Sequence, residues 1–340
     1  MPEPSPPPSI QASLPSKADL TAARSRLSGH LRLTPTIELE GLLPEATGRS
    51  PAGRSPARHS PARHSTARLV LKLELLQHTG SFKARGALNA ILAKQPSKGV
   101  VAASGGNHGA AVAWAARRCG VPAAIFVPAS SPELKAARIR SYGAELHLVD
   151  GLYADALEES RAHGLASGAT PVHAYDDPDV VAGQASLGLE LLEQEDPTTV
   201  LVSCGGGGLY SGVSLACGER ATVLPVEPEA APSLHAAVIA RRPVPVEVSG
   251  VAVDSLGARE AGTIATAVAL SAGVTPLLVS DAAILAAQQL LWERLRVVAE
   301  PGGATALAAL VGGAYEPAGD ETVVVVVSGA NTSMLPAERP

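Results

Sequence analysis

The sequence predicts an α/β fold of two lobes, with mainly parallel sheets flanked by helices. Beyond residue 68, short β-rich runs alternate with alanine-rich amphipathic stretches, which is typical of strand–helix units in a parallel sheet. The 340 residues, 46% of them hydrophobic, are enough to bury a large core. Glycine-rich loops follow three of the β-rich runs, where open α/β sheets bind their ligands.

The first 68 residues contain two segments without hydrophobic periodicity. Residues 1–16 hold a proline cluster, Pro6–Pro8, and we expect a disordered tail. Residues 50–68 repeat a Ser-Pro-Ala-Arg-His unit and are expected to form a flexible basic insertion. An arm that binds polyanions or is phosphorylated is the alternative for this segment, although such charge runs are usually solvated linkers.

The remaining elements follow in order from the β-rich and amphipathic runs. The expected strands lie at 69–74, 99–103, 123–127, 145–149, 198–203, 221–226 and 322–327. The expected helices lie at 81–93, 108–119, 132–142, 153–167 and 281–294, the last with Ser280 as N-cap. The spacing suggests a small domain at 99–175, inserted into a large cofactor-binding domain formed by 17–98 and 176–340.

Composition and charge exclude several classes of partner. The net charge is −5 and the isoelectric point is near 6.0, so no broad positive field attracts nucleic acid or an anionic membrane. No segment has the ~18 continuous apolar residues of a membrane span. Cys119, Cys204 and Cys217 lack the paired spacing of a zinc or redox site. We therefore expect a cytoplasmic protein with reduced thiols and a small-molecule substrate.

Lys83 is the first candidate for chemistry. It lies among small residues in Thr79–Ala87 (TGSFKARGA), at the start of an expected helix and directly after Phe82. A lysine in apolar surroundings loses affinity for its proton and becomes an amine nucleophile that can form a Schiff base with a carbonyl. The alternative is a lysine on a solvated helix face, which the glycine-rich loops make less attractive.

Three loops at strand ends are expected to converge on this lysine. Ser104–His108 (SGGNH) combines two glycines with three polar side chains. Gly205–Gly208 (GGGG) can turn successive backbone N–H groups toward one anion at a helix start. Ser328–Asn331 (SGAN) places a neutral hydroxyl after the apolar run 323–327. Neither the dinucleotide fingerprint nor the P-loop pattern occurs, so the glycine run suits an isolated phosphate.

An amine nucleophile, a phosphate cradle and a ring-stacking aromatic residue together meet the needs of pyridoxal 5'-phosphate. With these motifs, in this order, the chain resembles the serine/threonine dehydratase family of pyridoxal-phosphate enzymes, which has the fold type II (tryptophan synthase β-like) architecture. The resemblance runs from about residue 33 to 333. The motifs that carry it are TGSFKARGA at 79–87, SGGNHG at 104–109, GGGGL at 205–209, EPGGA at 300–304 and SGAN at 328–331.

The resemblance implies a role for each site residue. Lys83 would bond the cofactor aldehyde, Phe82 would pack on the ring, Asn107 would bond the ring 3'-oxygen and Ser328 would face the ring nitrogen. The cofactor phosphate would be held by Gly205, Gly206, Gly207, Gly208 and Leu209. The substrate carboxylate would be held by the loop at Ser104, Asn107 and His108, where backbone N–H groups at a helix start also suit an anion.

The resemblance also implies the reaction. The freed Lys83 amine would remove the Cα proton of L-threonine or L-serine, water would leave from Cβ, and a 2-oxo acid and ammonia would be released. A neutral Ser328 at the ring nitrogen limits how long a carbanion survives, which favours elimination over transamination. The family resemblance further suggests a homodimer, and only nine residues follow Asn331, where we expect no regulatory domain.

Departures from the family pattern leave three alternatives open. A serine racemase of this group needs a hydroxyl where Gly105 has no side chain, and cysteine synthases, which perform β-replacement, carry a different lysine motif. A non-catalytic amino-acid-binding protein is the alternative from another class, and the retained Lys83 argues against it. In relatives that bind a divalent cation, Glu227 and Ala231 match two ligands, but Ser233 replaces the second carboxylate. We therefore expect no metal.

Overall fold

The computed structural model describes residues 13–40 and 67–332 of the chain. Residues 50–66 of the predicted insertion at 50–68, and most of the predicted tail at 1–16, lie outside these residues. The insertion was predicted one residue too long, because Arg68 is the first residue of strand β2 (Arg68–Lys72). Ser16, the last residue of the predicted tail, caps α1 (Lys17–Leu27) by accepting a hydrogen bond from the backbone N–H of Asp19. The first helix of the described residues therefore begins directly at the end of the predicted tail.

A six-stranded sheet forms the centre of the larger part of the molecule. Its strand order is β1-β2-β10-β7-β8-β9, and all neighbours are parallel except β1 and β2. The strands are β1 (Thr36–Glu38), β2 (Arg68–Lys72), β10 (Thr322–Val326), β7 (Thr199–Ser203), β8 (Thr222–Pro228) and β9 (Leu277–Val279). The predicted strands of this sheet are confirmed, while the short edge strands β1 and β9 were not predicted.

Alternate residues of these strands enter two separate hydrophobic cores, because successive side chains point to opposite faces of a sheet. Val325 of β10 packs with α11 (Asp281–Leu295) and α12 (Pro301–Val311), whereas Val324 packs with α7 (Gly208–Cys217) and α10 (Thr263–Ala272). Helices therefore cover both faces. Such complete burial explains why these strands read as continuous apolar runs in the sequence.

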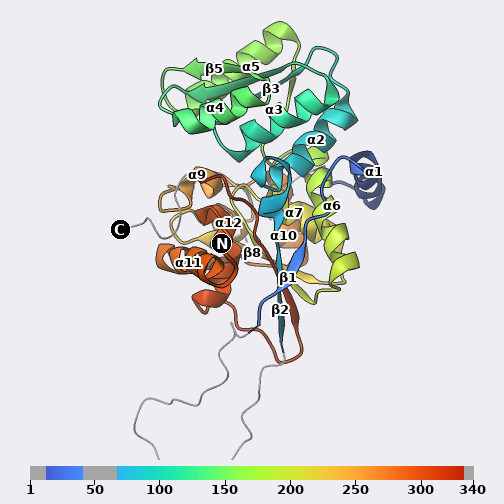
Figure 1. Cartoon of the computed structure of the whole chain (residues 1–340), viewed down its shortest axis with the longest axis vertical. Helices are drawn as coiled ribbons and strands as arrows, with labels where there is room; N and C mark the ends of the chain where they lie inside the picture. Colours follow the sequence, from blue (N-terminus) through green and yellow to red (C-terminus); the bar gives the residue numbers. More distant parts are fainter. Residues whose placement is uncertain (1–12, 41–66, 333–340) are drawn as a thin grey trace, which may run out of the picture.

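A second, four-stranded parallel sheet is built between residues 100 and 171. Its order is β5-β4-β3-β6, with β5 (Glu145–Val149), β4 (Ala123–Pro128), β3 (Val100–Ala103) and β6 (Thr170–Pro171). The helices between its strands are α3 (Asn107–Cys119), α4 (Glu133–Ser141) and α5 (Tyr153–Ser167). Figure 1 shows this sheet and its helices at one end of the molecule, apart from α11 and α12.

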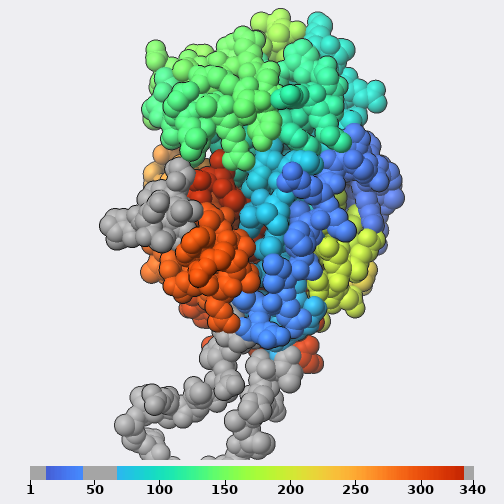
Figure 2. All heavy atoms as spheres, viewed as in Figure 1, coloured from blue at the N-terminus to red at the C-terminus, as the bar shows by residue number. Residues whose placement is uncertain are grey.

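The other helices join or flank the two sheets. They are α2 (Lys83–Lys94), α6 (Pro178–Gln194), α8 (Ser233–Ala240) and α9 (Val253–Leu256), with two short 3₁₀ turns at Glu74–Leu76 and His78–Gly80. In Figure 2 the segment that contains α2 crosses between the two parts. The boundaries predicted for a small domain at 99–175 stay a prediction. Among the described residues, no helix is long and apolar enough to cross a membrane.

Candidate active site

Lys83 is the first residue of α2, and backbone pairing fixes the strand-like residues before it. Ser81 pairs antiparallel with Gly329, and the N–H of Phe82 donates to the carbonyl of Ser328 at 3.1 Å. The predicted lysine motif and the predicted Ser328–Asn331 loop are thus in direct contact. The Nζ of Lys83 donates to the carbonyl of Ala174 at 2.7 Å.

The surroundings of Lys83 make its neutral amine easier to reach than that of an exposed lysine. Burial lowers its pKa to about 8, and the nearby carboxyl group of Glu300 opposes this shift only in part. Nζ lies 5.2 Å from the centre of the Phe82 ring. Within the described parts of the chain no carboxylate forms an ion pair with Lys83. A partly buried lysine with one carbonyl acceptor has the properties of an amine nucleophile.

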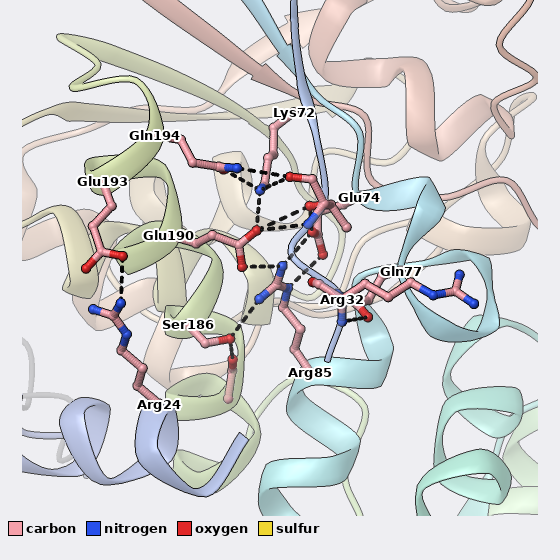
Figure 3. A network of polar contacts seen from close by, with 12 residues as sticks. Arg24, Arg32, Lys72, Glu74, Gln77, Arg85, Ser186, Glu190, Glu193 and Gln194 are labelled. Atoms are coloured by element: carbon pink, nitrogen blue, oxygen red, sulfur yellow. Dashed lines mark hydrogen bonds and ion pairs between the residues drawn. The ribbon is translucent and has the colours of Figure 1, made fainter. Parts of the chain in front are cut away.

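A buried network of charged side chains anchors α2 behind this lysine (Figure 3). Arg85 makes two hydrogen bonds to the Glu74 carboxylate, at 2.8 and 2.6 Å, and a third to Glu190 at 3.0 Å. Glu74 and Arg85 are almost completely buried, so the paired hydrogen bonds are needed to offset the loss of hydration. Lys72 joins the network through Glu190. The register of α2, and with it the place of Lys83, depends on this cluster.

The four glycines after β7 form a close-packed turn at the start of α7. A Cβ at Gly206 would lie 2.4 Å from the Tyr175 ring, and one at Gly207 would lie 2.2 Å from the Ala265 side chain. Gly207 also has φ of 88°, which favours glycine, and it caps α7 without a side chain. The first N–H groups of α7 are thus left available for an anion.

The other glycines of the turn, and Leu209, complete the cradle. A Cβ at Gly205 would lie 2.9 Å from the Leu256 backbone, and one at Gly208 would lie 2.9 Å from the backbone of Tyr175. Leu209 is buried in the core beneath the turn. Ala174 accepts the hydrogen bond from Lys83, and the next residue, Tyr175, packs against the glycine turn. These two consecutive residues therefore connect the lysine to the glycine turn. The arrangement fits a ligand bonded at Lys83 with a phosphate at α7.

In the Ser104–His108 loop the backbone is better placed for a ligand than the side chains. Ser104 Oγ accepts from the N–H of Gly106 at 3.2 Å, and α3 begins without a side-chain cap. The His108 ring is buried and its Nε2 lies 2.9 Å from the carbonyl of Val172. Burial, with Lys83 nearby, lowers the pKa of His108 to about 3. The imidazole is therefore neutral, and its contact is internal.

Asn107 forms a hydrogen bond to Glu300, which was not among the site residues predicted from the sequence. Its Nδ2 donates to Glu300 Oε1 at 2.6 Å, while its Oδ1 is buried without a partner among the described residues. Burial raises the pKa of Glu300 to about 7. Glu300 opens the EPGGA motif, and a carboxylate at the N-cap of an apolar helix was the signal that could have identified it.

Ser328 lies buried at the end of β10, beside the lysine motif. Its Oγ is 3.5 Å from the carbonyl of Gly302, at the limit of hydrogen-bond distance, and its N–H donates to the carbonyl of Gly303 at 3.3 Å. The hydroxyl is thus weakly held and uncharged. The structure thus brings together four of the predicted site residues, Phe82, Lys83, Asn107 and Ser328. Residues 174–175 lie between them and the glycine turn.

Residues 173–177 are a second part of the site that was not predicted from the sequence. Asp176 accepts hydrogen bonds from the N–H groups of Thr263 and Ile264, at 3.0 Å each, and so caps α10. Asp177 caps α6 in the same way. The two aspartates fix the backbone of Ala174 and Tyr175 between the lysine and the glycine turn. Asp177 at the N-cap and Pro178 at the first position of α6 form a helix-start signal in the sequence.

A cleft of about 520 Å³ opens between α4 and the start of α12, and Glu300 lies in its wall. Two cationic side chains of α4 span it. Lys135 forms an ion pair with Asp254 at 3.0 Å, and Arg138 donates to Asn331 Oδ1 at 2.8 Å. This cleft provides access from solvent toward the Asn107–Glu300 pair.

The residues at the position of the family's cation site are engaged in internal contacts. Both carboxylate oxygens of Glu227 accept backbone N–H groups at 2.8 Å, from Leu234 and His235 at the start of α8. Ser233 donates to the carbonyl of Ala258. Within 13–40 and 67–332 no cluster of three or more histidine, cysteine or carboxylate side chains could hold a metal ion. These residues do not fit a divalent cation.

Comparison with known proteins agrees with this geometry. The family model described as "Pyridoxal-phosphate dependent enzyme" matches residues 48–329. The chain belongs to this family. Pyridoxal phosphate is accordingly its cofactor, and the Lys83 amine and the glycine turn at the start of α7 are groups that fit it.

Similar proteins include lyases and racemases of the same fold. The L-threonine ammonia-lyase of Geobacter sulfurreducens is 37% identical over 273 residues, which are 77% of this chain and 67% of that protein. The chain spans about two thirds of the length of such curated relatives. The structure of maize serine racemase aligns with a TM-score of 0.83 at 30% identity, covering 94% of both chains. That of a threonine deaminase from T.th. aligns at 0.81 and 36% identity, covering 94% of this chain and 99% of that one. The predicted α/β, fold type II architecture is confirmed.

Proposed function

We propose that this protein is a pyridoxal-phosphate-dependent ammonia-lyase (dehydratase) that converts L-threonine, L-serine or both to a 2-oxo acid and ammonia. The observation that supports it most is Lys83, whose partly buried amine has a pKa near 8 and whose hydrogen-bond acceptor is the carbonyl of Ala174. The names of the similar lyases point to the same reaction.

Each group of the site has a part in this reaction. The cofactor supplies an aldehyde for covalent attachment and a ring that accepts electrons when the Cα proton leaves. Lys83 anchors the cofactor and, once released by substrate, its neutral amine removes the Cα proton. The N–H groups at the start of α3 hold the substrate carboxylate, and those at the start of α7 hold the cofactor phosphate. Departure of water from Cβ and hydrolysis then give the 2-oxo acid and ammonia.

Ser328 and Gly105 support elimination over the competing reactions. The uncharged Ser328 hydroxyl does not stabilise a positive ring nitrogen, so negative charge on Cα is short-lived and the Cβ–O bond breaks. Gly105 provides no hydroxyl for proton delivery to the opposite face, although Ser131 Oγ lies 3.1 Å from where its Cβ would be. Racemisation is therefore the less favoured activity, and β-replacement has no observation in its support.

The test is a set of assays on the purified full-length protein supplied with cofactor. We expect 2-oxo acid and ammonia in equal amounts from L-threonine or L-serine, and none from the Lys83→Ala variant. Side-by-side kinetics on threonine, serine and hydroxyaspartate assign the substrate preference. Conversion of L-serine to D-serine without ammonia would replace this function by a racemase. Amino-acid binding without any turnover would favour the non-catalytic alternative.

We also infer a cytoplasmic homodimer that acts on a small amino acid, without nucleic acid or membrane partners. The negative net charge supports the absence of nucleic-acid and membrane partners, and the three free cysteines of the described residues support a reducing compartment. The homodimer is inferred from the family resemblance. Light scattering during gel filtration should give twice the chain mass of 34.4 kDa. A single-chain mass at micromolar concentration would contradict the dimer.

A further inference from the structure

Ser81 is part of the lysine motif and lies two residues before Lys83. Its side chain is completely buried, and its hydroxyl has no hydrogen-bond partner among the residues that the structure describes. A buried hydroxyl without a partner usually costs stability, so native proteins seldom keep one without a reason. The backbone around Ser81 shows what the hydroxyl faces.

Ser81 and Gly329 form a non-hydrogen-bonded antiparallel pair. The flanking hydrogen bonds run from the Phe82 N–H to Ser328 O at 3.1 Å and from the Ala330 N–H to Gly80 O at 3.0 Å. In such a pair the two Cβ positions are close together and lie on the same face of the ribbon. The direction of a Cβ at Gly329 therefore gives the direction of the Ser81 side chain.

That direction leads to the Asn107–Glu300 pair. A Cβ at Gly329 would lie 2.1 Å from Glu300 Oε1 and 3.5 Å from Asn107 Nδ2. Asn107 uses one N–H of its Nδ2 to donate to Glu300, which leaves its second N–H as a donor toward a ligand, while its buried Oδ1 can only accept. An anionic ring oxygen beside Asn107 can accept more than one hydrogen bond, and the Ser81 hydroxyl supplies a second donor.

We propose that the Ser81 hydroxyl is an additional cofactor contact, which donates a hydrogen bond to the ring oxygen of pyridoxal phosphate on the side that Asn107 faces. The proposal rests on the cofactor site described above. The Ser81 hydroxyl would thus contact the cofactor while having no partner in residues 13–40 and 67–332, so its removal should have opposite effects on cofactor binding and on the stability of the cofactor-free chain.

The test is the Ser81→Ala variant of the full chain. After removal of the cofactor, titration with pyridoxal phosphate should show an affinity roughly tenfold or more below that of the unmodified protein, which is the typical effect of losing a hydrogen bond to a charged group. The pH midpoint of the bound cofactor's visible absorbance should also shift. The cofactor-free variant should unfold at the same urea concentration as the unmodified apoprotein, or at a higher one.

Ser160→Ala is the matched control, because Ser160 is also buried but donates to Leu157 O at 2.8 Å, within α5. It should leave cofactor affinity and absorbance unchanged. Unaltered affinity in Ser81→Ala would overturn the proposal, and so would a cofactor-free Ser81→Ala that is destabilised or fails to fold. If the unmodified protein binds cofactor but does not release 2-oxo acid, the proposed activity fails, while the Ser81 contact is still tested by the titration.

Discussion

Lys72, which is fully buried, and Lys83, which is partly buried, lie at opposite ends of the same segment, and their surroundings differ. Lys72 Nζ has three acceptors, the carbonyl of Thr34 at 2.7 Å, Gln194 Oε1 at 2.6 Å and the carboxylate of Glu190. Lys83 Nζ has the carbonyl of Ala174. Burial lowers the pKa of both, but at Lys72 the Glu190 charge opposes the shift directly. The ion pair with Glu190 stabilises the charged form of Lys72, whereas Lys83 has no ion-pair partner among the described residues and loses its proton more easily.

The same contrast extends to the neighbours of each lysine. Around Lys72 and Arg85 the charged groups are matched by partners, as Figure 3 shows. Around Lys83 the buried oxygens of Ser81 and Asn107 have no partners within the described ranges. A satisfied polar cluster fixes a fold, whereas unsatisfied polar atoms around a nucleophile indicate groups that a ligand completes.

Exchange of each lysine for methionine gives the largest expected difference. Lys83→Met should lower turnover by a factor on the order of 10³ or more, because it removes both the anchor and the base. It should leave the free energy of unfolding of the apoprotein unchanged or higher. Lys72→Met should instead destabilise the protein by about 3 kcal/mol, since a buried ion pair loses one partner. Steady-state assays measure turnover, and urea denaturation measures stability. Equal destabilisation by both variants would contradict the distinction between a catalytic Lys83 and a structural Lys72.

Within the buried network, Glu74→Gln should also destabilise strongly. The substitution leaves the guanidinium of Arg85 buried without its main charge partner, which typically costs about 3–5 kcal/mol. Chemical denaturation of the cofactor-free protein measures the loss. A change below about 1 kcal/mol would show that Glu190 alone is enough to neutralise Arg85.

The pH dependence of stability should report Glu300. Its pKa is raised from 4.5 to about 7 in the folded protein, so the folded state binds the proton more tightly than the unfolded state between these values. Stability from this group is therefore complete below pH 4.5 and falls as pH rises toward 7, by up to about 3 kcal/mol. Glu300→Gln should lack this fall. Parallel stability curves for the two proteins between pH 5 and 8 would be evidence against a buried, proton-binding Glu300.

The smallest effect is expected at the surface ion pair that joins Arg24 of α1 to Glu193 of α6. Arg24 and Glu193 are 2.6 Å apart, but their side chains are 49% and 59% exposed. Arg24→Ala should change the free energy of unfolding by about 0.5 kcal/mol or less and leave turnover unaltered. A loss comparable to that of Glu74→Gln would mean that exposure does not separate structural from incidental ion pairs in this protein.

The sequence predicted the strands, helices and loops that surround the site because the signals for these elements lie in neighbouring residues. A lysine between small residues, glycines after apolar strands and a helix start such as Ser280 are set by neighbours in the chain, and the predicted ranges agree with the structure within about two residues. The family match then confirmed the cofactor and the fold class. The roles of the individual site residues remain predictions for the experiments above.

What the sequence did not show depends on long-range contacts. Glu300 meets Asn107 across 193 positions of the chain, and Ala174 meets Lys83 across 91, so no local pattern could pair them. His108 was expected at the substrate, and its polar sequence context gave no hint that its ring is buried against Val172. The helix α6 was missed although Asp177 and Pro178 mark its start.

The most direct measurement is to find which lysine carries the cofactor. Reduction of the loaded protein with borohydride makes the lysine–cofactor bond permanent, and proteolysis with mass spectrometry then identifies the modified peptide. The expected result is one pyridoxyl group on Lys83 and an unmodified Lys72. Modification of Lys72 or another lysine in place of Lys83 would contradict the assignment of the active site.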